Sequence, residues 1–196
     1  MRVPPLPPPA TYFTPDQLAA RAVGGRPAQP TTKITLDDYD PEWPKLFEVE
    51  AVRIRSALGP SALAIEHVGS TAVPGLAAKR RLDIDLIVAD PADESAYVPV
   101  LEPAGYFLRS RDPEWYEHRC LWTEDHGVNL HVFGPDCDEH LRHLIFRDWL
   151  RAHPADRDRY EAEKRRVAEE HPWDAAEYIN QKAGVIIDIL RSAGLS

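Results

Sequence analysis

Two apolar, strand-like segments joined through a Gly-Ser turn place the strongest constraint on how this chain folds. The first segment ends at Glu66-His67-Val68, the turn begins at Gly69-Ser70, and the second segment is Leu82-Asp83-Ile84-Asp85-Leu86-Ile87-Val88. Side chains alternate between the two faces of an extended strand, so Asp83 and Asp85 project from the same face, roughly 6–7 Å apart. Two carboxylates on one face of an otherwise buried strand need a cation or strong hydrogen-bond donors. The pattern predicts a site for metal and phosphate.

Each half of this pattern has a chemical role and a simpler alternative. The Gly69-Ser70 turn can offer backbone N–H groups and a hydroxyl to a phosphate, while Asp83 and Asp85 can hold Mg²⁺ that bridges the phosphates. Alternatively, Ser70 only caps a short turn, and the aspartates are solvated on a half-exposed edge strand. The functional reading requires the chain to return after the turn, so that residues 82–88 pair with residues 63–68.

Later residues extend the predicted site. Asn129 and His131 alternate with apolar residues on the strand-like segment 128–133 and therefore share a face. If that face meets the aspartates, His131 is a third metal ligand or a base, and Asn129 orients a ligand. A purely structural histidine is an equally good interpretation. Lys79, Lys164 and Lys182 are candidates for neutralising phosphate charge, with solvated surface positions as the alternative.

Composition narrows the class of protein. The chain has 196 residues, of which 43% are hydrophobic, enough for one domain with a real core. Its net charge of −9 argues against general binding to nucleic acid or anionic membranes. Cys120 and Cys137 match no metal or redox spacing, and no apolar run approaches a membrane span. We therefore expect a cytoplasmic protein with two reduced thiols and no membrane partner.

The chain divides into an extension and one domain. Residues 1–32 form a proline-rich N-terminal extension, with a short capped helix at 14–22, and are expected to be solvated. The domain begins at residue 33 and ends near residue 193. The expected strands are 33–36, 63–68, 82–88, 106–108, 120–123 and 128–133, the last two forming a hairpin. The expected helices are 41–58, 93–104, 138–152, 155–171 and 173–193.

Taken together, these segments resemble the GrpB-like family of the nucleotidyltransferase (polymerase-beta-like) superfamily. The residues that carry the resemblance are His67 to Lys79, Asp83-Ile-Asp85, Val128 to Phe133, Phe146 to Pro154, and Tyr160 with Lys164. The resemblance implies an α/β (α+β) fold with a minimal mixed β-sheet flanked by helices and a helical C-terminal half. It also assigns phosphate binding to Gly69 and Ser70, and binding of a divalent metal, Mg²⁺ or Mn²⁺, to Asp83 and Asp85.

Two positions depart from the pattern of the family. The superfamily usually supplies a third carboxylate from a later strand, where this chain has Asn129 and His131. The family commonly has proline after the lysine of its first motif, where this chain has Arg80. The first departure bears on standard two-metal transfer, and the second alters the loop and its charge.

Three functions follow from these residues. The leading one is metal-dependent transfer of a nucleotidyl group from an NTP to an acceptor, with Asp83, Asp85 and His131 as catalytic and metal-binding residues. The acidic charge favours a small acceptor over a long nucleic acid. The alternatives are a non-catalytic module that binds nucleotides or phospho-ligands, and a phosphohydrolase in which a histidine and two aspartates bind a transition metal.

Overall fold

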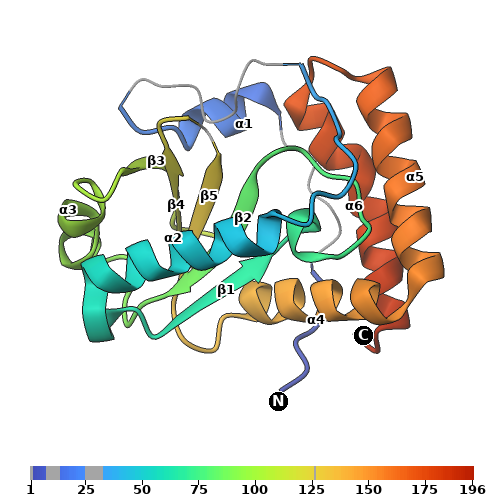
Figure 1. Ribbon diagram of the computed structural model, residues 1–196. Helices are drawn as coiled ribbons and strands as arrows, with labels where there is room; N and C mark the ends of the chain where they lie inside the picture. The colour runs from blue at the N-terminus through green and yellow to red at the C-terminus, as the bar shows by residue number, and fades with distance from the viewer. Residues whose placement is uncertain (1, 8–13, 25–32, 126) are drawn as a thin grey trace.

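The fold is a mixed five-stranded sheet flanked by helices (Figure 1). A computed structural model describes residues 2–7, 14–24, 33–125 and 127–196. The strands are β1 (Ala64–Val68), β2 (Leu82–Ile87), β3 (Tyr106–Asp112), β4 (His118–Thr123) and β5 (Val128–Phe133). The α-helices are α1 (Pro15–Ala20), α2 (Trp43–Leu58), α3 (Val98–Leu101), α4 (Asp138–Ala152), α5 (Pro154–Glu170) and α6 (Ala175–Ser192). A 3₁₀ turn, η2 (Ser70–Ala72), follows β1.

The register of the sheet brings the polar positions together. The strand order is β1-β2-β5-β4-β3, with β2 antiparallel to β1 and parallel to β5. Asp83 lies beside Asn129, and Asp85 lies beside His131. Because paired residues on neighbouring strands point to the same face of a sheet, all four side chains share one face. The expected return of residues 82–88 onto residues 63–68, and the hairpin of β4 and β5, are both confirmed.

The opposite face of the sheet carries the main hydrophobic core. Ile84 and Leu86 of β2 are fully buried there, with Trp43 and Ile54 of α2 in the same cluster. Figure 1 shows α2 lying across the sheet. The alternation along β2 therefore separates an apolar face, which binds α2, from a polar face, which carries the aspartates. The expected amphipathic helix over 41–58 is confirmed as α2.

The helical C-terminal half forms a second core beside the polar face. Leu150 of α4, Tyr160 of α5 and Ile189 of α6 cluster with Val73 and Leu76, which follow the η2 turn. Pro154 opens α5, where a proline costs no hydrogen bond, and the Asp174 side chain accepts from the backbone N–H of Glu177 at the start of α6. The three expected helices are confirmed, and their packing fixes them against the turn.

Three segments differ from the expectations. Residues 33–36 are not a strand, since the only ladder contact nearby among the described residues is an isolated bridge between Asp37 and Ala78. The expected helix over 93–104 is reduced to a 3₁₀ turn and the four-residue α3. Pro103 limits it, because a proline has no N–H to donate to the carbonyl four residues earlier in the helix. Strand β3 extends to Asp112, beyond the expected residue 108, because it pairs with β4 along its whole length.

The described part of the N-terminal extension packs on the domain, contrary to the expected solvated segment. The Arg2 guanidinium lies 2.5 Å from the Asp138 carboxylate, and Pro4 is buried. The expected short helix is confirmed as α1, capped by the Thr14 hydroxyl. After it, Val23 N donates to the Arg109 carbonyl at 2.9 Å. The expectation for residues 8–13 and 25–32 lies outside the described residues. Within the described ranges, no helix is both long and apolar enough to cross a membrane.

Candidate functional site

The turn after β1 brings the chain directly against Asp83. Gly69 has φ = 69°, and a Cβ placed on it would lie 2.5 Å from Asp83 Oδ2. Only glycine combines that backbone conformation with so close an approach. The turn is held locally, because His67 Nε2 and Thr71 Oγ1 are hydrogen-bonded at 2.9 Å and Ala72 N donates to the Gly69 carbonyl at 3.3 Å. Gly69 and Ser70 therefore lie beside Asp83, as the sequence predicts.

Asp83 is the accessible carboxylate of the pair, with 32% of its side chain exposed. Asn129 Nδ2 donates to Asp83 Oδ1 at 2.7 Å, and His131 Nε2 lies 3.7 Å from the same oxygen. Burial raises the pKa of Asp83. The attraction of His131 and the hydrogen bond from Asn129 lower it by more, so the pKa of Asp83 lies below its ordinary value. Asp83 is therefore an anion at neutral pH, in contact with Asn129 and facing His131.

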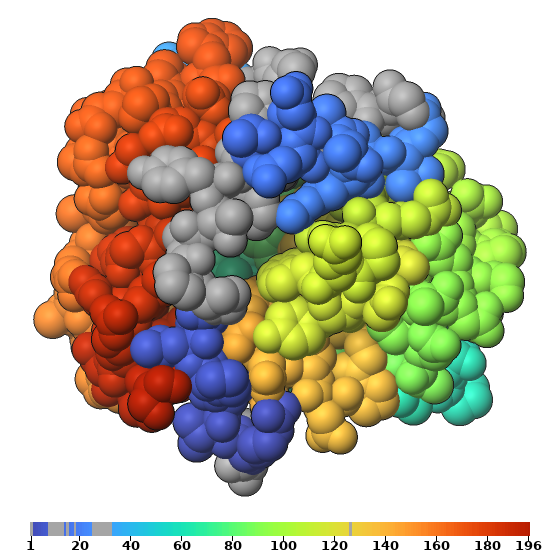
Figure 2. Space-filling view, turned by 180° about the vertical axis from the view of Figure 1, so that it is seen from behind, coloured from blue at the N-terminus to red at the C-terminus, as the bar shows by residue number. Residues whose placement is uncertain are grey.

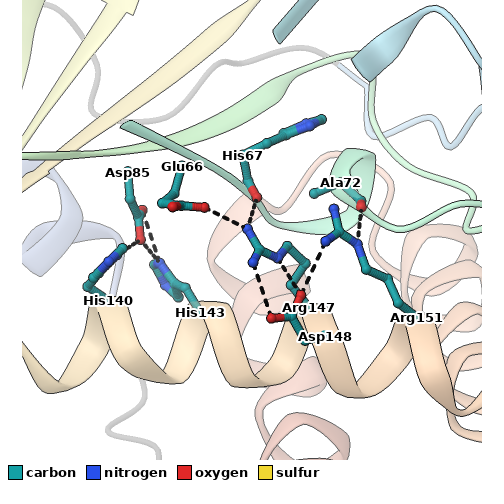
Figure 3. Close-up of polar contacts among 9 residues, drawn as sticks. All are labelled: Glu66, His67, Ala72, Asp85, His140, His143, Arg147, Asp148 and Arg151. Atoms are coloured by element: carbon teal, nitrogen blue, oxygen red, sulfur yellow. Dashed lines mark hydrogen bonds and ion pairs between the residues drawn. The ribbon is translucent and has the colours of Figure 1, made fainter. Parts of the chain in front are cut away.

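Asp85 is completely buried, and both of its oxygens are engaged by helix α4 (Figure 3). His140 Nδ1 lies 2.8 Å from Asp85 Oδ2, and His143 Nδ1 lies 3.0 Å from the same oxygen and 3.1 Å from Oδ1. Burial raises the pKa of Asp85 and lowers that of His143, but their mutual attraction reverses both effects. The pKa of Asp85 falls and that of His143 rises well above its ordinary value. The two groups form a buried ion pair between β2 and α4.

His131 is held from the side opposite Asp83 by a second histidine. His118 Nε2 and His131 Nδ1 are hydrogen-bonded at 3.0 Å, and their rings stack with centroids 5.2 Å apart. His118 is buried, which lowers its pKa well below the ordinary value, and Trp115 packs edge-on against its ring. The donor in this contact depends on the tautomer: when His131 donates from Nδ1 to a neutral His118, the Nε2 lone pair of His131 faces Asp83 and can bind a metal or accept a proton.

Three lysines converge on the other side of Asp83. Lys164 of α5 is 1% exposed, and its Nζ donates to the Ala77 carbonyl and contacts Ser70 Oγ at 3.0 Å. The Nζ atoms of Lys79 and Lys182 lie 4.2 and 4.1 Å from the centroid of the Tyr178 ring. The structure therefore brings together, from a loop and two helices, all three lysines that the sequence analysis proposed for phosphate.

The surroundings of these lysines do not fully compensate a positive charge on each of them. Burial lowers the pKa of Lys164 to about 7, that of Lys182 to about 7 and that of Lys79 to about 8. Within the described ranges, no ion pair within 4 Å joins any of the three to a carboxylate, and the charge of Asp83 raises the pKa of each only in part. Such a pocket gains stability from a bound anion, because the anion replaces the water that burial removed.

Figure 2 shows a hollow on the face that is turned away from the viewer in Figure 1. It is bordered by the blue helix α1 and the yellow-green segment between β3 and β4, and its floor has the teal-green colour of the chain that follows β1. Ser70, Lys79 and Lys182 are each partly exposed. A ligand in solution can therefore reach them.

The predicted three-ligand metal set is only partly assembled. In the described part of the chain, no three His, Cys, Asp or Glu side chains are arranged to hold a metal ion, and both oxygens of Asp85 contact histidines. Asp83 and His131 do face a common space. Mg²⁺ is usually held by one or two carboxylates together with substrate phosphates, so Asp83 beside the lysine pocket suits Mg²⁺ bound with a phosphate ligand. The metal itself stays a prediction.

The family model described as GrpB protein matches residues 33–192. The chain belongs to the GrpB family. This match has the same start as the domain expected from the sequence and leaves out the proline-rich extension.

Relatives of this GrpB-family chain cover most of its length. It is 53% identical over 161 residues to a UPF0157 protein of Halalkalibacterium halodurans, covering 82% of each protein. It is 40% identical to a UPF0157 protein of Streptomyces coelicolor over 92% of this chain and 93% of that protein. The crystal structure of the conserved protein GrpB from Enterococcus faecalis superposes with a TM-score of 0.73 at 31% identity, covering 81% of this chain and 96% of the other.

Sequence reasoning missed the contribution of α4 to this site of the GrpB domain. The helix presents His140, His143 and Arg147 toward the polar face, where Arg147 Nη1 donates to the Glu66 carboxylate at 3.0 Å and to the His67 carbonyl at 2.9 Å (Figure 3). The spacing of the two histidines and the arginine, at i, i+3 and i+7, is a one-face pattern that could have revealed them. His118 carries no comparable signal, because its position depends on the pairing of β4 with β5.

Proposed function

We propose that this GrpB-family protein is a metal-dependent nucleotidyltransferase that moves a nucleotidyl group from an NTP to a small acceptor. One observation carries the proposal: Ser70 and the lysines Lys79, Lys164 and Lys182 converge beside the accessible carboxylate of Asp83. A triphosphate has the charge and the length to occupy the lysine pocket and still place its α-phosphate near Asp83. The net charge of −9 favours a small acceptor over a long nucleic acid.

In this proposal, the residues of the site have three roles: phosphate binding, metal binding and proton transfer. Lys79, Lys182 and the Ser70 hydroxyl bind the β- and γ-phosphates, and Asn129 holds the Asp83 carboxylate in place. A divalent cation, Mg²⁺ or Mn²⁺, would be held by Asp83 with His131 beside it, and would supply neutralisation of charge on the phosphates. His131, with its neighbour His118 fixing the ring, takes the proton of the acceptor hydroxyl.

A second candidate function is non-catalytic binding of a nucleotide or phospho-ligand. The observation that favours it is the buried ion pair of Asp85 with His143, which occupies the carboxylate that the superfamily uses for metal. Asn129 and His131 stand where a third carboxylate is usual, which supports the same alternative. This module would bind the phosphates in the lysine pocket and release them unchanged. A phosphohydrolase with a transition metal remains the third hypothesis, and metal analysis of the purified protein tests it directly.

Binding is tested by thermal unfolding of the full chain with each NTP, with and without Mg²⁺. At a ligand concentration of one hundred times Kd, linkage gives about 2.7 kcal/mol of stabilisation, which is readily seen as a rise in Tm. We expect an NTP to raise the Tm of the wild-type protein. Lys182→Met should reduce this rise, and in Asp83→Asn the rise should no longer depend on Mg²⁺. The matched control is Lys45→Met, because Lys45 is exposed on α2 and forms its ion pair with Glu42 of the same segment. No shift with any NTP in folded protein contradicts the proposal.

Measurement of NTP turnover distinguishes the transferase from the non-catalytic binding module. Release of pyrophosphate from an NTP in the presence of a panel of small hydroxyl and amino acceptors, lost in Asp83→Asn and in His131→Ala, supports the transferase. A Tm shift without pyrophosphate release, for every NTP and acceptor, supports the binding module. Release that persists in Asp83→Asn argues against this site as the place of transfer.

A further inference from the structure

Ser70 and Lys164 form a pair whose chemistry the proposed transferase does not use. The Nζ atom of Lys164 lies 3.0 Å from Ser70 Oγ, and it also donates to the Ala77 carbonyl. The serine comes from the turn after β1 and the lysine from the middle of α5, so the contact joins residues 94 positions apart. A binding role for Ser70 needs only its hydroxyl. It does not need a buried amine within hydrogen-bond distance of that hydroxyl.

The surroundings of Lys164 favour its uncharged form. Its side chain is 1% exposed, and within the described residues no carboxylate lies within ion-pair distance. Burial lowers its pKa to about 7. The charged groups around it are Glu161 and Arg165 on its own helix, Asp83 on β2, Lys79 on the preceding loop and Lys182 on α6. The two neighbouring lysines make a third positive charge at this position costly.

The hydrogen bonds orient the amine as a base. A neutral amine that donates one N–H to the Ala77 carbonyl can direct its lone pair toward the Ser70 hydroxyl, which then donates to it. The Lys164 Nζ atom also lies 4.9 Å from the centroid of the Tyr160 ring, and the Tyr160 hydroxyl interacts with Ser70. Because burial raises the pKa of Tyr160 to about 12, this phenol keeps its proton at neutral pH and can stabilise negative charge that develops on Ser70 Oγ. Activation of a serine by an adjacent base is the general requirement for a nucleophilic hydroxyl.

The charge of the pocket selects the electrophile. The amines of Lys79 and Lys182, which a bound anion would hold in their protonated form, lie beside the Tyr178 ring, and Ser70 is partly exposed. A neutral ester would leave these charges without a partner, whereas a phosphoanhydride satisfies them and presents its terminal phosphorus near Ser70. An anionic phosphoanhydride is therefore the class of substrate that fits.

We propose that Ser70, with Lys164 as its base, is a covalent nucleophile that accepts the terminal phosphoryl group of a bound phosphoanhydride. Ser70 Oγ attacks the terminal phosphorus, its proton moves to Lys164 Nζ, and the bond from phosphorus to the bridging oxygen breaks. The products are phosphoserine at position 70 and the anhydride shortened by one phosphoryl group. For an NTP substrate this inference rests on the proposed function, because that function places the triphosphate in the lysine pocket.

The test is mass spectrometry of the full chain after incubation with ATP or with inorganic tripolyphosphate, each with and without Mg²⁺. We expect a gain of one phosphoryl group, about 80 Da, mapped by peptide analysis to Ser70 and absent in Ser70→Ala. Loss of a general base typically costs 10²–10⁴-fold, so Lys164→Met should label at least a hundredfold more slowly. Lys45→Met is the control and should label at the wild-type rate. Lys164→Arg provides a charged variant that cannot act as a base, should Lys164→Met fail to fold.

The pH dependence of labelling gives an independent readout. The initial rate in the wild-type protein should rise with pH through about 7, as Lys164 loses its proton. A rate that is flat between pH 6 and 8.5, or labelling retained in both Lys164 variants, overturns the role of the lysine. A label that maps to another residue, or a nucleotidyl group on Ser70, overturns the assignment of the step.

The outcomes separate this inference from the proposed function. Wild-type protein that shows the nucleotide-dependent Tm shift but no phosphoryl label contradicts the inference alone. Labelling by tripolyphosphate, with no Tm shift for any NTP, contradicts the proposed function alone. Absence of both the label and the shift contradicts both.

Discussion

Gly69 and Asp83 are in direct contact: a methyl group on Gly69 would lie 2.5 Å from Asp83 Oδ2. The turn that offers Ser70 and the strand that offers the carboxylate are thus packed at the closest approach a backbone allows. Any side chain at position 69 must move either the turn or the carboxylate. The distance between the two halves of the site is set at this contact.

Gly69→Ala should therefore lose both stability and ligand binding. The backbone conformation of Gly69, with φ = 69° and ψ = −167°, is essentially restricted to glycine and costs about 1–3 kcal/mol for a residue with a Cβ, and the contact with Asp83 adds to this cost. The matched control is Gly59→Ala, because Gly59 also has positive φ, at 55°, but a Cβ at this position would meet no atom within 4 Å. Urea denaturation should show the larger loss for Gly69→Ala, and only this variant should lose the NTP-dependent Tm shift. Equal effects of the two substitutions would contradict the contact.

Asp85→Asn should destabilise the protein far more than Asp83→Asn. Removing one partner of a buried ion pair costs about 3–5 kcal/mol, and we expect the lower end of that range because His143 keeps a second carboxylate, Glu139, 3.5 Å from its Nε2. Asp83 is 32% exposed, so its neutralisation should cost about 1 kcal/mol or less. Chemical denaturation at pH 7 measures both. Comparable stability of the two variants would show that Asp85 does not hold α4 to the sheet.

Stability without ligand should rise with pH in a way that depends on Lys164. Its pKa falls to about 7 in the folded state, below the ordinary value of 10.5, so between these values the unfolded chain binds more protons. Stability from this group therefore increases as pH rises from about 7 to about 10, by at most about 1.4 kcal/mol per pH unit. The free energy of unfolding of Lys164→Met relative to wild type, measured at several pH values, should fall across that window. A pH-independent difference would contradict the lowered pKa of this buried amine.

Arg147→Met should loosen the attachment of α4 to β1. Arg147 Nη1 bonds both the Glu66 carboxylate and the His67 carbonyl, and its side chain is only 12% exposed (Figure 3). Hydrogen bonds to charged groups contribute about 1.5–3 kcal/mol, so we expect a loss of about 2 kcal/mol in urea denaturation. Arg159→Met is the control, because the ion pair of Arg159 with Asp188 is half exposed and should contribute less than about 1 kcal/mol. Similar losses in the two variants would argue against the role of Arg147.

Local patterns in the sequence were sufficient for much of the architecture. Alternating and helical periodicities predict α2, β1, β2, the hairpin of β4 and β5, and the three C-terminal helices, because apolar residues recur in each at the spacing of its own secondary structure. They fail where proline shortens the helix expected over 93–104. They also fail where a short apolar run, 33–36, makes only an isolated bridge within the described chain, because a strand needs a partner that local sequence does not specify.

For the site, the sequence by itself determined that Asp83 and Asp85 lie on one face of their strand, that Asn129 and His131 lie on one face of theirs, and that Gly69-Ser70 forms a turn. Only the tertiary structure decided what these groups meet. The parallel pairing of β2 with β5 places Asp83 beside Asn129, and the packing of α4 on the sheet brings His143 into contact with Asp85. The packing of α5 and α6 on the turn then brings Lys164 to Ser70. Periodicity fixes the direction of a side chain within its own element, whereas the partner across an interface depends on long-range packing, which no local pattern encodes.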